Sequence, residues 1–131
     1  MEFILSATVT LITLGIYLRV LANVSKVRAK TNIWGPATSG SFELECAIRS
    51  QTNLTEHLVM FFPLLWLCAW LNSDLLAAVL GGFFPVGRIL YARYYPTGHR
   101  TGFLIQFFSE IALFLAVSYA LVSSVLEQAT P

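Results

Sequence analysis

Four long apolar stretches limit what this chain can fold into more than any other feature of its sequence. The chain is 56% hydrophobic and 11% charged, whereas a soluble domain carries about 25% charged residues. A bilayer-spanning helix needs about 20 residues, and four such spans are expected at residues 3–24, 44–71, 75–95 and 101–125. The second helix is expected to start near Phe42, in water, with its apolar part from Leu54. We therefore predict one all-α integral membrane domain over residues 1–131, a bundle of four transmembrane helices.

Basic residues flank only two of the three connections between these spans. The second connection and both ends of the chain carry none. The positive-inside rule places basic connections in the cytoplasm, so connections one and three are predicted to be cytoplasmic and both termini to lie on the opposite side. The formal net charge of +1 gives no reason to expect nucleic acid as a partner. Seven of the eight basic residues follow this pattern: Lys26, Arg28, Lys30, Arg49, Arg88, Arg93 and Arg100.

A polar stripe precedes the apolar part of the second span. Arg49, Asn53 and Glu56, with Glu45 one turn earlier, follow spacings of three and four residues and so share one helix face. A run without charge, LVMFFPLLWLCAW, begins directly after them. Charged groups at the mouth of a spanning helix are costly unless they meet partners, a ligand or water. The stripe predicts a binding site, and pairing with other helices is the alternative.

A second polar face is expected on the third span, where Arg88, Tyr91 and Tyr95 follow helical spacing. Arginine presents a planar fork suited to carboxylates, and tyrosine and asparagine add neutral donors. Two such faces opening to the cytosol suit a small anionic ligand, while the surrounding lipid supplies apolar molecules. This arrangement favours chemistry that joins a polar cosubstrate to a lipophilic one.

Three segments resemble signatures of one family, the membrane-associated proteins in eicosanoid and glutathione metabolism. FELECAIRSQTNLTEH resembles the second-helix pattern E-R-x-x-R-A-x-x-N-x-x-E, GRILYARYY the third-helix pattern, and HRTGF the start of the fourth helix. The resemblance implies a homotrimer of four-helix subunits that binds glutathione between neighbours. It also implies a membrane-bound glutathione transferase that joins glutathione to lipophilic electrophiles, with glutathione peroxidase as a further activity.

The resemblance also assigns roles to individual residues. It implies that Arg100 stabilises the glutathione thiolate and that Arg28 contributes from the first helix, where Lys26 remains the alternative. This chain lacks the arginine that follows the first glutamate of the second-helix signature, and its interval from Tyr95 to Arg100 is short. The expected glutathione contacts are Arg49, Gln51, Asn53, Glu56, His57, Tyr91 and Tyr95.

The chemistry asked of Arg100 follows from the properties of a thiol. A free thiol has a pKa of about 8.5, so little thiolate exists at neutral pH. A guanidinium within about 4 Å, in a partly dry site, lowers that pKa by about one or two units. Arg100, at the start of the fourth span, is the best candidate for this role. Cys46 and Cys68 lie most of a membrane thickness apart and suit neither a metal site nor a disulfide.

Three more charges are expected inside the membrane: Arg19, Arg88 and Glu110. Their similar depths predict structural pairing, and a proton-carrying role for Glu110 is the alternative. Pro85 and the Gly81-Gly82 pair predict a kink or a close helix approach in the third span, and Pro63 the same in the second. Two other functions remain as alternatives, a non-catalytic lipid-presenting scaffold of the same family and a small exporter of lipophilic cations.

Overall fold

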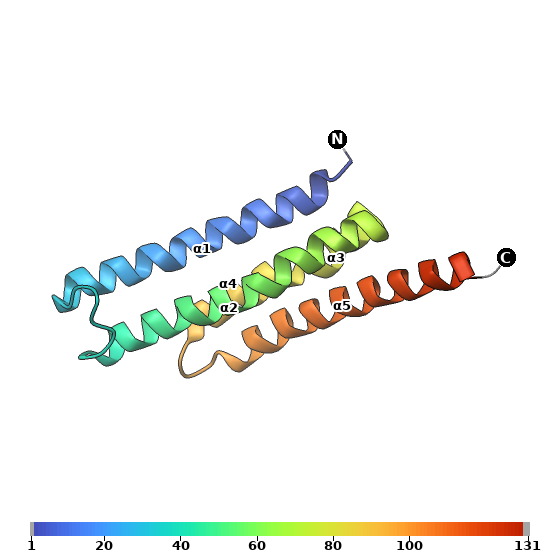
Figure 1. Ribbon diagram of the computed structural model, residues 1–131. Coiled ribbons are helices and arrows are strands. Elements are labelled where there is room, and N and C mark those ends of the chain that lie inside the picture. Colours follow the sequence, from blue (N-terminus) through green and yellow to red (C-terminus); the bar gives the residue numbers. More distant parts are fainter. Residues whose placement is uncertain (1, 130–131) are drawn as a thin grey trace.

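The computed structural model describes residues 2–129 as helices joined by short connections. Helices α3 and α4 follow one another across Gly82 and act as one span, so the described residues hold four helices long and apolar enough to cross a membrane. The four-span, all-α membrane fold predicted from the sequence is confirmed, and Figure 1 shows the helices side by side. The helices are α1 (Ile4–Thr31), α2 (Phe42–Leu71), α3 (Asp74–Gly81), α4 (Phe83–Tyr94) and α5 (Arg100–Ala129).

The interruption predicted in the third span lies at Gly82. The Gly82 backbone N–H still donates to the carbonyl of Ala78, at 2.8 Å, and Pro85 falls in the first turn of α4. Proline is tolerated in a first turn because the N–H it lacks has no partner within the helix there. Helix α2, by contrast, continues through Pro63 without a break.

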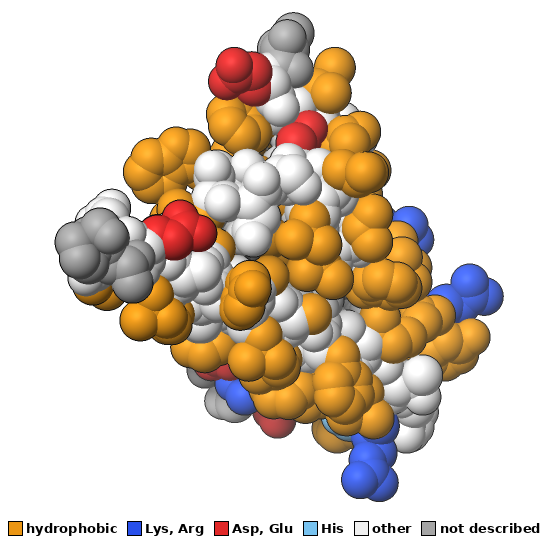
Figure 2. Space-filling model, turned by 90° about the vertical axis from the view of Figure 1, so that its right-hand side faces the viewer, with side chains coloured by type: hydrophobic (Ala, Val, Ile, Leu, Met, Phe, Trp, Pro, Cys, Tyr) orange, Lys and Arg blue, Asp and Glu red, His pale blue; other side chains and the backbone are white. Residues whose placement is uncertain are grey.

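The chain reverses direction at each connection, so the polar features gather at two ends. The connections 32–41 and 95–99 lie at one end, and both ends of the described chain lie at the other (Figure 1). Figure 2 views that second end, where acidic side chains and a wide hydrophobic surface face the viewer and basic side chains show only towards the rim. Basic residues therefore share one end of the bundle, as the sequence predicts. Which side of the membrane this end faces stays a prediction.

A small apolar core joins the helices, and large apolar side chains also cover the outside. The rings of Phe61 and Phe84 stack in the core with centroids 3.9 Å apart. Outside, Leu11, Trp70 and Tyr119 are more than 70% exposed, as expected of side chains that lipid covers. The fully buried core side chains include Leu54, Phe61, Leu65, Phe84 and Leu113.

Several hydroxyl side chains inside the spans bond to carbonyls of their own helices. Thr8 donates to the carbonyl of Ile4 at 2.7 Å, and Thr13 donates to that of Val9 at 2.8 Å. Such bonds satisfy a polar group without a partner on another helix, which matters because lipid offers none. Serine and threonine can therefore occupy apolar spans at little cost.

A carboxylate from α3 caps the start of α1. The two side-chain oxygens of Asp74 accept hydrogen bonds from the backbone N–H groups of Leu5 and Ser6, both at 2.8 Å. The first N–H groups of a helix lack partners within it and carry partial positive charge. A single carboxylate therefore satisfies two of them and fixes the start of α1 against the start of α3.

Helices α4 and α5 meet backbone to backbone. A Cβ atom added at Gly87 would lie 2.6 Å from the amide nitrogen of Gln106 and 2.7 Å from the carbonyl oxygen of Gly102, and one added at Gly102 would collide with the amide nitrogen of Tyr91. Small residues let membrane helices approach this closely. The contact also brings the polar side chains of the two helices within reach of one another.

Replacing Gly102 with alanine should therefore push the two helices apart. We expect the free energy of unfolding to fall by about 1–3 kcal/mol, the usual cost of overpacking, as measured by thermal unfolding in detergent. Gly15→Ala is the matched control, since nothing lies within 4 Å of a Cβ atom added there. It should be neutral or slightly stabilising. Equal unfolding temperatures for the two variants would contradict the close contact.

Candidate polar site on α2, α4 and α5

Arg88 is the centre of a buried polar cluster that joins three helices. Its side chain is fully enclosed, at 1% exposure. The Nη1 atom donates to Asn53 Oδ1 at 2.7 Å and to Gln106 Oε1 at 2.8 Å, while Nη2 donates to the carbonyl of Ser50 at 3.2 Å. One guanidinium from α4 thus binds acceptors on α2 and α5. It fixes Asn53 and is itself out of reach of a ligand.

An aromatic cluster continues from Arg88 towards the basic end of the bundle. The Arg88 guanidinium lies over the ring of buried Tyr91, 4.5 Å from its centroid. The rings of Tyr91, Tyr95 and His99 pack with centroids 5.1–5.3 Å apart. His99 Nδ1 also donates to the carbonyl of Pro96 at 2.6 Å. The cluster holds the connection from α4 to α5 and positions the start of α5.

A second buried pair joins α2 and α5. His57 Nδ1 lies 2.8 Å from Glu110 Oε2, and both side chains are nearly enclosed. The predicted pairing of Glu110 with Arg88 and Arg19 is therefore wrong. Arg88 bonds to neutral acceptors, and Arg19 stays exposed on α1. The reason is that similar depth does not bring side chains together when they point to different faces of the bundle.

Arg49 and Glu56 form the outer part of the polar stripe. Arg49 Nη1 lies 3.4 Å from Glu56 Oε1, and the side chains are 57% and 53% exposed. An exposed pair of this kind contributes little to stability, so both groups remain available to a ligand. Asn53, on the same face of α2, is held by Arg88, so the stripe carries an exposed ion pair and a buried polar group.

The structure groups most of the predicted site residues and leaves some apart. Arg100 is exposed at the start of α5 and makes no hydrogen bond or ion pair within residues 2–129. Gln51 lies two residues after Arg49, about 200° around the helix, and so faces away from it. The Arg28 guanidinium donates to the carbonyls of Ile33 at 3.2 Å and Ala37 at 2.9 Å, which secures the first connection. Of the others, Arg49 pairs with Glu56, Asn53 bonds to Arg88 beside Tyr91 and Tyr95, and His57 pairs with Glu110.

Gln106 is a residue of the polar cluster that is not predicted from the sequence. It is fully buried, and its side-chain oxygen accepts a hydrogen bond from Arg88. A signal was present in the fourth span, because Gly102, Gln106 and Glu110 recur at intervals of four and therefore share a face. A small residue followed by two polar ones on that face indicates a close approach with a polar partner on the neighbouring helix.

Four membrane-crossing helices around a buried arginine, with a charged face near one end, define a polytopic integral membrane protein. The sequence matches the MAPEG family over residues 6–119, so the chain belongs to that family. The predicted family resemblance is confirmed.

Individual relatives place the chain near both an uncharacterized protein and a transferase. It is 36% identical over 115 residues to an uncharacterized protein of Synechocystis sp., covering 86% of this chain and 84% of that protein. It is 37% identical over 68 residues to human microsomal glutathione S-transferase 2 and 34% identical over 68 residues to the mouse protein. These last two matches cover 52% of this chain and 46% of each transferase. The similarity to the transferases therefore extends over about half of either chain.

Proposed function

We propose that this protein is a membrane-bound glutathione transferase that joins the glutathione thiolate to lipophilic electrophiles, with peroxidase activity towards lipid hydroperoxides as a side reaction. The observation that carries the proposal is an exposed, oppositely charged pair, Arg49 and Glu56, at the same end of the bundle as the unpaired Arg100. The similarity to two microsomal glutathione S-transferases supports the same choice of cosubstrate.

Glutathione is a tripeptide with two carboxylates, one ammonium group and a thiol, and the site offers complements to each. In this proposal a carboxylate meets the Arg49 fork and the ammonium group meets Glu56. Asn53, fixed by Arg88, and the tyrosine hydroxyls add neutral hydrogen bonds. The thiol lies near Arg100. The thiolate attacks the electrophile, an S–C bond forms, and the leaving group departs with the bonding electrons. Glutathione acts as cosubstrate, and the proposal involves no metal.

The lipophilic substrate enters from the surrounding bilayer, and glutathione enters from water. The positive-inside rule puts the basic end in the cytoplasm, so the proposed active site opens there and both termini face the opposite side. A site at the membrane surface has both phases beside it. This explains why so many charges lie where the helices leave the apolar layer.

The arrangement supports sites shared between subunits of a homotrimer. Arg49 and Gln51 project from opposite sides of α2, and Arg28 lies on α1, so one copy does not surround a ligand with all of them. In a closed ring, two neighbours supply these groups to one site. Native mass spectrometry from detergent should show trimers. Only monomers or dimers would count against both the trimer and the shared site.

Arg49→Ala tests the binding mode. We expect glutathione affinity, measured by calorimetry, to fall about tenfold or more, because a charge-assisted and bidentate contact is lost. Arg93→Ala is the control, since it removes another exposed arginine from the same end of the bundle but not from the polar stripe. Unchanged affinity in Arg49→Ala would remove Arg49 from the site.

A conjugation assay separates the enzyme from its non-catalytic alternative. The purified protein in neutral detergent is mixed with glutathione and 1-chloro-2,4-dinitrobenzene, and formation of the thioether is followed by absorbance. A transferase turns over many equivalents per site. Glutathione binding without turnover of this or any other electrophile would favour a lipid-presenting scaffold, and neither binding nor turnover would overturn the proposal.

A further inference from the structure

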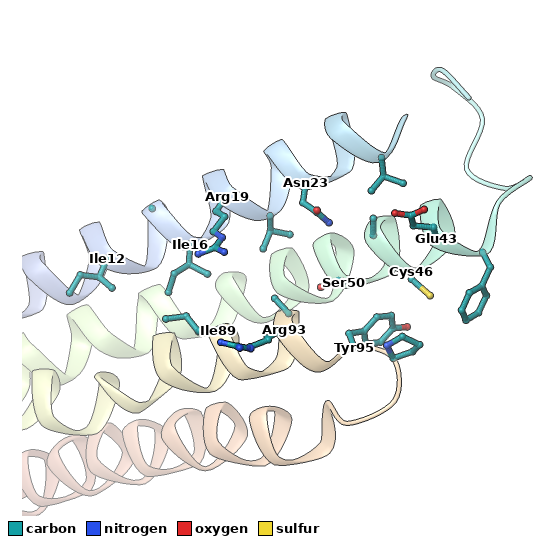
Figure 3. Close-up of a pocket in the computed structure, with 17 residues that line it drawn as sticks. Ile12, Ile16, Arg19, Asn23, Glu43, Cys46, Ser50, Ile89, Arg93 and Tyr95 are labelled. Carbon is teal, nitrogen blue, oxygen red and sulfur yellow. The ribbon is translucent and has the colours of Figure 1, made fainter. Parts of the chain in front are cut away.

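A separate cavity of about 770 Å³ opens between α1, α2 and α4, and the proposed reaction does not use it. Figure 3 shows it from the side. Arg49, Asn53, Glu56 and Arg100 do not line it, and only Tyr95, at its edge, belongs to the residues assigned to glutathione. This cavity is called the α1–α4 groove.

The α1–α4 groove is apolar in one half and polar in the other. Ile12 and Ile16 on α1 and Ile89 on α4 line the apolar part, and Arg19, Asn23 and Arg93 follow towards the connections (Figure 3). Along α1 the lining runs from Ile12 to Val27, which is about 22 Å at 1.5 Å per residue. One leaflet with its headgroups is about as thick, half of roughly 40–45 Å. The groove therefore has the length and polarity of a single lipid.

Two guanidinium groups in the groove lack anionic partners. In Figure 3, Arg19 extends from α1 towards α4, and Arg93 lies on α4 across the gap. Within residues 2–129, Arg19 makes no hydrogen bond or ion pair, and the contact made by Arg93 is with the ring of Tyr94, at 5.9 Å. The one acid lining the groove, Glu43, is held by Lys30 at 2.7 Å. Unpaired cations this close to the apolar layer are costly, so an anion is the expected neighbour.

We propose that the α1–α4 groove binds one anionic phospholipid from the leaflet at the basic end of the bundle. Its phosphate lies between Arg19 and Arg93, and one acyl chain lies against Ile12, Ile16 and Ile89. A soluble anion would satisfy the arginines but leave the apolar half open, and a neutral lipid would do the reverse. The bound lipid fills the gap between α1 and α4 and thereby stabilises the bundle.

The test uses the purified full chain in neutral detergent, with native mass spectrometry counting bound lipid. At equal concentrations, phosphatidylglycerol should be retained over phosphatidylcholine by about tenfold or more, since both arginines attract the anionic headgroup. Arg19→Gln and Arg93→Gln should each reduce this preference, and the double variant should abolish it. Lys26→Gln, which removes a nearby exposed charge outside the groove, should leave it intact.

Thermal unfolding gives a second readout. Phosphatidylglycerol should raise the unfolding temperature of the wild type but not of the double variant, whereas inorganic phosphate should raise neither. The proposal would be overturned if the wild type retained both lipids equally or if Lys26→Gln lost the lipid preference as the arginine variants do. It would also be overturned if inorganic phosphate stabilised the wild type as much as phosphatidylglycerol does. A trimer that is retained in native mass spectrometry with no lipid bound would also overturn it, because a second copy of the chain would then block the groove. Unchanged glutathione affinity in the double variant would show that the groove is not the glutathione site.

Discussion

Exchanging Arg88 for methionine is expected to destabilise the bundle more than any other single change in the polar site. The change leaves Asn53 Oδ1 and Gln106 Oε1 without their donor, and each buried acceptor left unpaired costs about 1–3 kcal/mol. We expect a loss of about 3 kcal/mol, measured by thermal unfolding in neutral detergent. Glutathione affinity should also fall, because Asn53 is no longer held, although Arg88 itself contacts no ligand.

Two further variants separate this effect from loss of charge alone. Arg93→Met removes an exposed guanidinium five residues later on α4 and should change stability by less than about 0.5 kcal/mol. Adding Gln106→Leu to Arg88→Met should restore part of the loss, because donor and acceptor are then both absent. A wild-type unfolding temperature in Arg88→Met would mean that the cost of burying the guanidinium equals what its hydrogen bonds contribute.

Arg100→Ala is expected to reduce turnover far more than binding. A cation that stabilises the thiolate acts mainly on the reacting state, so its loss should appear in kcat rather than in affinity. If Arg100 lowers the thiol pKa by about one to two units, the thiolate fraction at pH 7 falls about tenfold or more without it. The ultraviolet absorbance of bound thiolate should vanish near neutral pH, and the rate profile should shift to alkaline pH.

The conservative variant and a neighbouring arginine provide the controls. Arg100→Lys should recover part of the rate, because charge matters more here than the planar fork. Arg93→Ala should keep the wild-type pH profile. Wild-type turnover at pH 7 in Arg100→Ala would mean that another residue stabilises the thiolate. Arg28 would be the next candidate. Its guanidinium would then exchange its hydrogen bonds to the carbonyls of Ile33 and Ala37 for a contact with the thiolate.

The fold was largely predictable because a bilayer imposes strong rules on sequence. Twenty apolar residues in a row have few alternatives to a spanning helix, and the break at Gly82 follows from a glycine pair and a nearby proline. The helix ends were less predictable. Helix α1 continues to Thr31 and α5 to Ala129, beyond the apolar stretches, because a helix that leaves the membrane still gains from its backbone hydrogen bonds.

For the candidate site, the sequence predicted which residues share a helix face but not which partners their side chains contact. Helical spacing correctly placed Arg49 and Glu56 together and brought Arg88 beside Tyr91. It did not reveal that Asn53 turns towards Arg88 or that His57 turns towards Glu110. Those choices depend on which helices adjoin, and the α4–α5 contact at Gly87 and Gly102 likewise brings Gln106 to Arg88. Neither glycine carries chemistry of its own, so a search for reactive side chains passes over both.

The capping of α1 by Asp74 has a consequence for biogenesis. The N–H groups of Leu5 and Ser6 are made almost 70 residues before the carboxylate that accepts their hydrogen bonds. Until α2 has crossed the bilayer and α3 has begun its return, the first turn of α1 depends on water or lipid headgroups for its hydrogen bonds. Helix α1 therefore inserts before its final position is fixed, and the arrival of α3 fixes it.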